Sequence, residues 1–288
     1  MNNYKFLFYL FFIVTTSCGL REKRFVGAFH TPDNYDLINP VKMVLPVTLD
    51  EISGLTIGEN GNIWAIQDEA SVVYELKWPD NDIIRRSKFA KNMDVEDILY
   101  TEKGLFALKS NGDIYEISGI FTDRASSKKH DFPFKGKRDL EALGYFDEDK
   151  LLLYCKDCKL DGDKNVASGF FFDLNSKQFS EAKGFKLTEK KMRKLLQEED
   201  HYKLTVKPSA MAFHPIEKKL YVLSSVGKWI LIMDRFGDIE NIYRLNPRLF
   251  KQAEGICFNQ AGDMFISNEA QDGNANILMF EYKAKRHD

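Results

Sequence analysis

Polar side chains that could bind a cation recur along the chain in one short alternating pattern. Each copy of the pattern has a central polar residue, and these are Ser53, Glu96, Glu141, Ser209 and Glu254. A second polar residue stands two positions earlier, at Glu51, Asp94, Asp139, Lys207 and Gln252. Residues two apart on a strand point to the same side. Carboxylate and amide oxygens bind hard cations such as Ca²⁺, so the pattern suggests cation binding.

A polar turn and a strongly apolar run follow every copy, and a polar pair closes that run. In the stretch QAEGICFNQAGDMFISNE, from Gln252 to Glu269, the two runs predict a hairpin around a Gly-centred turn. The start of its first strand and the end of its second therefore lie at the same end. The closing positions bring further polar residues to that end: Asp68, Glu69, Lys109, Lys156, Ser225, Asn268 and Glu269.

The spacing of the copies indicates which elements position these side chains. The central residues are 43, 45, 68 and 45 residues apart. A third apolar run follows each hairpin, and weaker fourth runs can be read, for example in EAKGFKL from Glu181. A repeat of about 45 residues with four strands is typical of a propeller blade. We therefore predict an all-β chain, a β-propeller of five four-stranded blades between Glu51 and Tyr282.

The last unit has no fourth strand of its own, because the chain ends soon after it with KAKRHD. The apolar segment PVKMVLPVTL, which starts at Pro40, stands before the first unit and belongs to none. We expect it to be the outer strand of the last blade, since pairing the two ends of the chain removes exposed sheet edges. A sixth, irregular blade built from residues 25–45 is the alternative.

The longest interval contains LTEKKMRKLLQEEDHYKL, which has helix formers and neither Gly nor Pro. It predicts a helix at about 188–200 that Thr188 caps and that has an apolar stripe of Met192, Leu195 and Leu196. A solvated surface helix is the preferred interpretation, and a lid over the ring is the alternative. The segment FTDRASSKKHDFPF, from Phe121, is predicted to be a polar loop.

A ring of blades would gather the polar positions around the mouth of its central channel. The residues expected to bind a ligand there are Glu51, Asp68, Asp94, Glu96, Lys109, Asp139, Glu141, Lys156, Lys207, Glu254, Asn268 and Glu269. Close carboxylates repel one another unless a cation lies between them. One solution is a structural collar, in which Lys109, Lys156 and Lys207 pair with acidic residues of the ring, namely Asp94, Glu96, Asp139 and Glu141. The other is a divalent cation held by Glu51, Glu254 and Asn268. A mouth with both signs of charge also suits a zwitterionic or sugar-like ligand.

The first residues, MNNYKFLFYLFFIVTTSC, have a lysine, an apolar run and small residues before Cys18. This order is typical of a secretory signal peptide, and the cysteine at the cleavage point resembles a bacterial lipobox. We expect a lipoprotein signal peptide at 1–17, a lipid on Cys18, a tether at 18–39, the propeller at 40–283 and a tail at 284–288. The expected location is the cell envelope, on the periplasmic face of the outer or inner membrane, with the cell surface as the alternative.

The remaining cysteines and the overall charge limit the function classes. Cys155 and Cys158 form one C-x-x-C pair at the end of an apolar run, and no second pair completes a zinc site. A local disulfide or two free thiols is favoured over a catalytic role. The formal net charge is −2, which gives no electrostatic reason to expect nucleic acid as a partner.

The stretches EISGLTIGENGNIWAIQDE, PSAMAFHPIEKKLYVLSS and AEGICFNQAGDMFISNEA resemble the SdiA-regulated family of exported bacterial β-propellers. The resemblance covers roughly Pro40 to Tyr282 and implies an exported or envelope location. A more distant similarity to calcium-dependent propeller lactonases and esterase-like phytases implies acidic metal ligands at the channel mouth. Carried over by position, these would be Glu51, Asn268 and Glu254.

These observations predict a lipid-anchored, extracytoplasmic β-propeller that acts as a ligand-binding or scaffold module at its acidic channel mouth. Its expected partners are the membrane, through the lipid on Cys18, and a small molecule or envelope protein that the sequence does not identify. The alternative is a calcium-dependent hydrolase, lactonase-like or phytase-like, with Asp94, Glu96 or Asp139 as general base. Ca²⁺ is the one cofactor that the pattern suggests.

Overall fold

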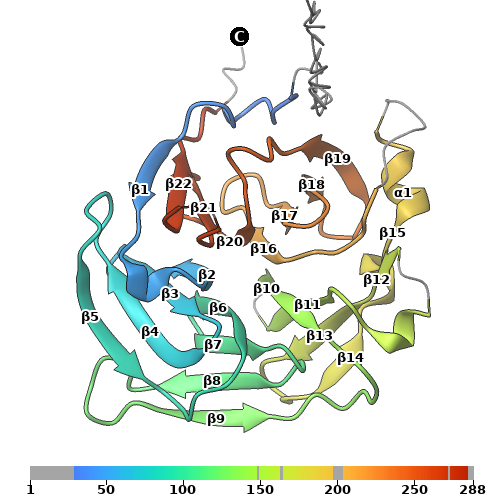
Figure 1. Ribbon diagram of the computed structural model, residues 1–288. Coiled ribbons are helices and arrows are strands. Elements are labelled where there is room, and N and C mark those ends of the chain that lie inside the picture. The colour runs from blue at the N-terminus through green and yellow to red at the C-terminus, as the bar shows by residue number, and fades with distance from the viewer. Residues whose placement is uncertain (1–28, 148, 163–164, 197–203, 272, 285–288) are drawn as a thin grey trace, which may run out of the picture.

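Five antiparallel sheets of four strands surround a central axis in the computed structural model (Figure 1). The structure describes residues 29–147, 149–162, 165–196, 204–271 and 273–284. The predicted five-bladed β-propeller is therefore confirmed. The predicted signal peptide and Cys18 lie outside the described residues. Within the described ranges, no helix is long and apolar enough to cross a membrane.

Each blade runs from an innermost strand at the axis to an outermost strand at the rim. The first two blades contain β2 (Ile52–Ile57), β3 (Ile63–Gln67), β4 (Ala70–Leu76), β5 (Ile83–Lys88), β6 (Val95–Thr101), β7 (Gly104–Lys109), β8 (Ile114–Ser118) and β9 (Ser126–His130). The next two contain β10 (Leu140–Asp147), β11 (Lys150–Cys155), β13 (Gly169–Asp173), β14 (Phe179–Glu181), β16 (Ala210–Phe213), β17 (Leu220–Ser224), β18 (Trp229–Met233) and β19 (Ile239–Arg244). The last contains β20 (Ala253–Phe258), β21 (Met264–Asn268), β22 (Asn276–Phe280) and β1 (Val41–Val44).

The inner strands are apolar on both faces because each lies between two neighbouring blades. All five residues of β17 and all five of β18 are buried, whereas no residue of the outer strand β19 is. Among the described residues, five apolar clusters fill the five gaps between blades. Trp64, for example, packs in the gap between the first two blades with Ile98. The core is thus a ring of interfaces rather than one central mass.

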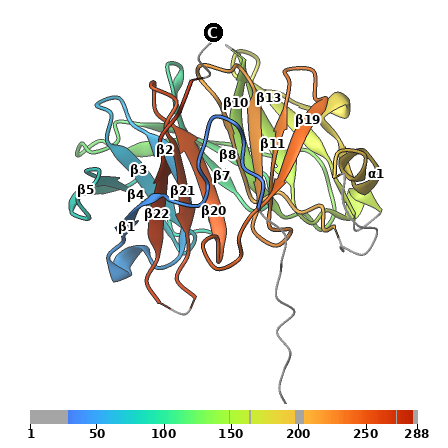
Figure 2. The same ribbon diagram turned by 90° about the horizontal axis from the view of Figure 1, so that it is seen from above.

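The N-terminal strand closes the ring. β1 pairs antiparallel with β22, with Val41 opposite Met279 and Val44 opposite Asn276. The segment after Pro40 is therefore the outer strand of the last blade, as predicted, and this strand does not belong to a sixth blade. Seen from the side, β20, β21 and β22 cross the thickness of the ring beside β1 (Figure 2).

The segment that precedes β1 is docked on two turns of the ring. The Nδ1 atom of His214 accepts the backbone N–H groups of Ile216 and Glu217 at 3.1 and 3.0 Å. The Nε2 atom therefore has the proton, and it donates to the Tyr35 hydroxyl at 2.6 Å. That hydroxyl in turn donates to the carbonyl oxygen of Gly262 at 2.5 Å. This chain of hydrogen bonds fixes the entering segment between the fourth and fifth blades.

Two outer strands differ from the predictions. The segment from Phe121 is not only a polar loop, because β9 (Ser126–His130) lies within it and completes the second blade. In the third blade the outer strand is β14 (Phe179–Glu181), so only its last residue falls in the predicted EAKGFKL run. Outer strands are solvated on one side, and β9 and β14 therefore lack the apolar alternation that identifies a strand.

A short helix, α1 (Glu189–Arg193), follows the two-stranded sheet of β12 (Val166–Ala167) and β15 (Leu187–Thr188). The Thr188 hydroxyl caps it by accepting the backbone N–H of Lys191 at 3.2 Å. Met192 is fully buried, whereas Leu195 is 37% exposed. The helix lies at the outer rim beside β19 and does not cover the channel (Figure 1). Residues 197–203, which include the end of the predicted helix, lie outside the described residues.

Replacing Met43 with Ala tests the closure by β1. Met43 is 3% exposed and packs in the gap between the last and first blades. Its truncation is expected to lower the free energy of unfolding by about 2–4 kcal/mol, as measured by urea denaturation. Val41→Ala, on the same strand but 51% exposed, should cost less than about 1 kcal/mol. Equal effects of the two substitutions would contradict the observed pairing.

Candidate functional site

A β-bulge at the start of four innermost strands turns one side chain out of the ladder. The pairing passes from Ile52–Gln67 directly to Gly54–Ile66, so that Ser53 has no partner. The same shift leaves Glu96, Glu141 and Glu254 unpaired in their strands. Bulges re-aim side chains and are frequent beside functional sites. All four side chains line one cavity at this end of the channel.

Backbone hydrogen bonds hold the ends of the strands together around the mouth. In four blades, the residue directly after the second strand donates its backbone N–H to the carbonyl oxygen of the residue directly before the first strand. These hydrogen bonds are Asp68 to Glu51 (3.2 Å), Ser110 to Asp94 (3.1 Å), Lys156 to Asp139 (2.8 Å) and Glu269 to Gln252 (3.0 Å). In the fourth blade, the Ser224 hydroxyl donates to the Lys207 carbonyl at 2.5 Å. The sequence-distant polar positions thus meet at one end of the ring.

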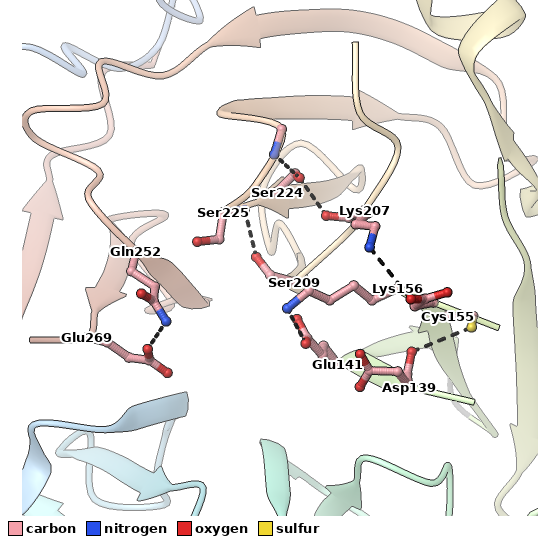
Figure 3. Close-up of polar contacts among 12 residues, drawn as sticks. Asp139, Glu141, Cys155, Lys156, Lys207, Ser209, Ser224, Ser225, Gln252 and Glu269 are labelled. Carbon is pink, nitrogen blue, oxygen red and sulfur yellow. Dashed lines mark hydrogen bonds and ion pairs between the residues drawn. The ribbon is translucent and has the colours of Figure 1, made fainter. Parts of the chain in front are cut away.

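The cavity at this mouth has a volume of about 270 Å³. Its lining has six carboxylates and one ammonium group. The lining residues are Glu51, Ser53, Asp68, Glu96, Glu141, Lys156, Ser209, Gln252, Glu254 and Glu269. Figure 3 shows Gln252 and Glu269 on one side of the opening and Lys156 with Glu141 on the other. The cavity is therefore strongly acidic.

Seven of the twelve predicted site residues line this cavity: Glu51, Asp68, Glu96, Glu141, Lys156, Glu254 and Glu269. The other five, Asp94, Lys109, Asp139, Lys207 and Asn268, do not. Ser53, Ser209 and Gln252 also line the cavity. The sequence pattern placed these three at the mouth as repeated positions, although they were not counted among its twelve ligand-binding residues.

The predicted lysine collar is formed only in part. Lys156 makes an ion pair with Glu141, as Figure 3 shows. Lys207 instead lies 3.7 Å from Asp157, outside the cavity. Lys109 makes no ion pair with any described residue. Burial disfavours the charge of Lys156, but the Glu141 and Glu254 carboxylates outweigh it and raise the pKa of the lysine. Lys156 is therefore the one ammonium group in the lining of this cavity.

Several carboxylates of the cavity have raised pKa values, first because they are buried and then because other carboxylates lie close to them. Burial, with the charges of Glu141 and Asp94, raises the pKa of Glu96 to about 9. Burial, with the charges of Glu254 and Glu51, raises the pKa of Glu269 to about 8. Perturbed pKa values of this kind cluster at functional sites. At neutral pH, these two groups favour their protonated forms unless a cation is supplied.

Two carboxylate oxygens of the cavity have no partner. The Glu141 side chain is 10% exposed, and its Oε2 atom is buried without a hydrogen bond to any described residue. The Oδ1 atom of Asp68 is in the same state. The serines differ, because the Ser53 and Ser209 hydroxyls donate to backbone carbonyls of the next blade at 2.7 and 2.9 Å. Buried acceptors without donors are costly, so these two oxygens add to the destabilising effect of the acidic ring.

The predicted metal ligands do not form a compact set. Glu51 and Glu254 line the cavity, but Asn268 is 1% exposed behind it and donates from Nδ2 to Asn276. Among the described residues, only Cys155, Cys158 and Asp161 bring three ligand atoms within 4.8 Å of one another. Cys155 and Cys158 form a disulfide, so their thiolates are not free for a metal.

No family model matches the chain, and no curated protein matches it. The glutaminyl cyclase of Myxococcus xanthus has a similar structure, with a TM-score of 0.56 at 10% identity over 84% of this chain and 94% of that chain. A streptogramin B lyase gives 0.44 at 16% identity over 81% of this chain, which spans only 65% of that protein. The calcium structure of a Trichoderma reesei enzyme of Family AA12 gives 0.49 at 13% identity, over 78% of this chain and 80% of that one.

At these identities the likeness shows the fold alone. The fold is one that enzymes also use, and it is compatible with binding or catalysis. Fold and cavity together define a five-bladed β-propeller with an acidic cavity at one end of its channel. The resemblance to the SdiA-regulated family, which rests on blade motifs, stays a prediction.

The raised pKa values predict an unusual dependence of stability on pH. An unfolded glutamate titrates near pH 4.3, whereas Glu96 in the folded chain has a pKa of about 9. The stability that this group contributes is complete below its unfolded pKa and is lost as the pH rises through its folded value. The free energy of unfolding should decrease by roughly 3–4 kcal/mol between pH 6 and pH 9 from this group.

Urea denaturation across this pH range measures the effect. Glu96→Gln and Glu269→Gln should each reduce the slope, because glutamine does not titrate. Glu59→Gln, at an exposed position in the turn before β3, should leave it unchanged. Burial also raises the pKa of Glu141 to about 8, so part of the slope should remain in the variant carrying both cavity substitutions. A slope in that variant equal to that of the unsubstituted protein would refute this account.

Removing the single cavity lysine should be strongly destabilising. Lys156→Met leaves the buried Glu141 without its partner and is expected to cost about 3 kcal/mol at pH 8. Adding Glu141→Gln to the same protein should recover most of that loss, since no uncompensated charge remains there. Lys207→Met removes only a partly exposed pair with Asp157 and should cost less than about 1 kcal/mol. Comparable losses for the two lysines would show that Lys156 is not the counter-ion.

Proposed function

We propose that the chain is a lipid-anchored, extracytoplasmic ligand-binding β-propeller, and that its acidic cavity binds a small organic cation. The supporting observation is the imbalance of six carboxylates against one lysine in an open cavity of about 270 Å³. Carboxylates this close require either protons or a cation between them. A cationic ligand would supply the missing charge.

The imbalance is greatest on the side of the cavity away from Lys156. Asp68 has a raised pKa because of burial and the charges of Glu51 and Glu69. Glu269 accepts a hydrogen bond from Gln252, which is neutral. Neither Glu51, Asp68 nor Glu269 makes an ion pair with a described lysine or arginine. These three carboxylates form the part of the site that would hold an ammonium group.

The rest of the lining favours an organic ligand over a bare ion. Neutral polar side chains, Ser53, Ser209 and Gln252, stand among the carboxylates of the lining, and their existing hydrogen bonds hold them in place. Lys156, on the opposite wall, could contact an oxygen of the ligand. An amine that also has hydroxyl or carboxylate oxygens would use both walls, which agrees with the zwitterionic or sugar-like ligand expected from the sequence.

Calcium fits this arrangement less well. Calcium ligands lie 2.3–2.6 Å from the ion, so their oxygens lie within about 5 Å of one another. No three described carboxylates of the cavity meet a spacing of 4.8 Å. The alternative function, a calcium-dependent hydrolase, would need these side chains to move together around the ion.

The location and the anchor are part of the proposal. A lipid on Cys18 would hold the propeller at a membrane of the cell envelope, and the support is the lipobox-like order of the first residues. Fractionation of a Cys18→Ser variant tests this, since the protein should leave the membrane fraction.

Titration with putrescine and 1,4-butanediol tests the proposed ligand class. The two molecules have the same carbon chain, but only putrescine has ammonium groups. At constant ionic strength, putrescine should raise the melting temperature in a saturable way and butanediol should not. In the variant Asp68→Asn/Glu269→Gln, the affinity for putrescine should fall by about tenfold or more, equivalent to about 1.4 kcal/mol. Glu59→Gln is the matched acidic control.

Two outcomes would contradict the proposal. One is a response to putrescine that is the same in the cavity variant and in the control. The other is a larger, site-specific rise with CaCl₂ that Glu254→Gln abolishes, which would favour the calcium-dependent hydrolase.

A further inference from the structure

A second and larger cavity opens at the opposite end of the channel. It has a volume of about 610 Å³ and is lined by the C-terminal halves of all five innermost strands, β2, β6, β10, β16 and β20. The sequence pattern gave no indication of it. Binding sites for small molecules are mostly apolar cavities of about 300–1,000 Å³, so its size is that of a ligand site.

The floor and walls of this cavity are apolar. The floor consists of side chains that are at most 4% exposed: Leu55, Ile98, Leu143, Met211 and Ile256. Half-buried aromatic side chains, including Phe146, Phe213 and Phe258, form the walls nearer the opening. Water gains few hydrogen bonds in such a space, whereas an apolar ligand would gain both burial and contacts.

The one buried charge-bearing group in the lining is already satisfied. Asp97 is 4% exposed, and its two carboxylate oxygens accept the backbone N–H groups of Ile98 and Leu143 at 2.8 and 2.9 Å. The residue thereby ties β6 to β10. Since both oxygens have backbone partners, the inner end of the cavity does not require a cationic group on a ligand.

The opening has unpaired positive charge on one side. Lys218 and Arg235 lie on two turns of the fourth blade, are exposed, and make no ion pair with a described residue. In the third blade, Asp147 lies 4.0 Å from Lys150, which offsets its charge. Glu102 is the remaining acidic residue of the rim. Both cations therefore come from the fourth blade, whereas Glu102 and Asp147 come from the second and third blades.

We propose that this cavity is a second binding site that takes a small amphiphilic anion. The apolar body would fill the space between the innermost strands, and a carboxylate or sulfonate head would lie between Lys218 and Arg235. This site is independent of the acidic cavity, which differs from it in charge, polarity and the residues that form it. Either could be lost without the other.

Two fluorescent probes with similar aromatic bodies test the site. The anionic probe is 8-anilinonaphthalene-1-sulfonate, and N-phenyl-1-naphthylamine is its neutral counterpart. Both should bind with a stoichiometry of one, and the sulfonate should bind more tightly. Decanoate should displace either probe at lower concentration than decanol does.

The variant Lys218→Asn/Arg235→Gln distinguishes the contribution of the anionic group of the ligand to binding from that of its apolar part. It should weaken binding of the sulfonate by about tenfold and leave the neutral probe unaffected. Asparagine suits position 218, where φ is 56°. Glu102→Gln, in the second blade, is the matched control and should not weaken the sulfonate. Ala212→Phe, which places a ring in the cavity, should abolish both probes.

Ala212→Phe changes a buried residue and could prevent folding. The substitutions of Lys218, Arg235 and Glu102 change exposed residues, so these variants should fold and still test the proposal. Unchanged sulfonate affinity in Lys218→Asn/Arg235→Gln would overturn the assignment of the head group. A stoichiometry above one, or no fluorescence increase with the folded protein, would overturn the site itself.

Discussion

Each inner strand of this ring is apolar on both faces, and only a neighbouring blade on each side can bury both. This requirement determines the rest of the structure. A single four-stranded sheet would leave one face in water, so the five sheets are stable only as a closed circle. The circle needs a strand from the start of the chain, β1, to complete the blade at its end. The same closure forces acidic residues from distant parts of the sequence to become neighbours around one axis.

The cavity at one end of the channel brings six carboxylates and only one lysine together. Four β-bulges turn side chains toward the axis, and a single lysine offsets part of the resulting charge. Burial and neighbouring carboxylates raise the pKa values of Glu96 and Glu269, so these two groups keep protons at pH values where exposed ones would be ionised. Such an arrangement works against stability in the empty protein, and proteins commonly retain strain of this kind at positions that bind something. On the outer surface of the propeller, by contrast, exposed lysines and acids form ordinary ion pairs, such as Lys103 with Asp149.

The sequence predicted the features that depend on repetition. The period of about 45 residues indicated the blades, and the recurring polar positions led to seven cavity residues, among them Glu96, Glu141 and Glu254. It did not predict features that depend on side-chain packing or on solvation. Asn268 and Lys207 occupy repeated positions, but local partners turn their side chains away from the cavity. The strand β9 was missed because its exposed residues do not alternate. The apolar cavity has no sequence signal, since its residues also read as ordinary strand interiors.

The hydrogen bonds of Tyr35 with His214 and Gly262 show at which end of the ring the N-terminal segment lies. Those two residues belong to turns that join innermost strands to second strands, and the turn that contains His214 borders the mouth of the apolar cavity through Pro215 and Lys218. The N-terminal segment therefore reaches the ring at its apolar end. The two openings of the channel therefore differ in their neighbours as well as in their charge, since the first described residues of the chain lie beside the apolar opening and away from the acidic one.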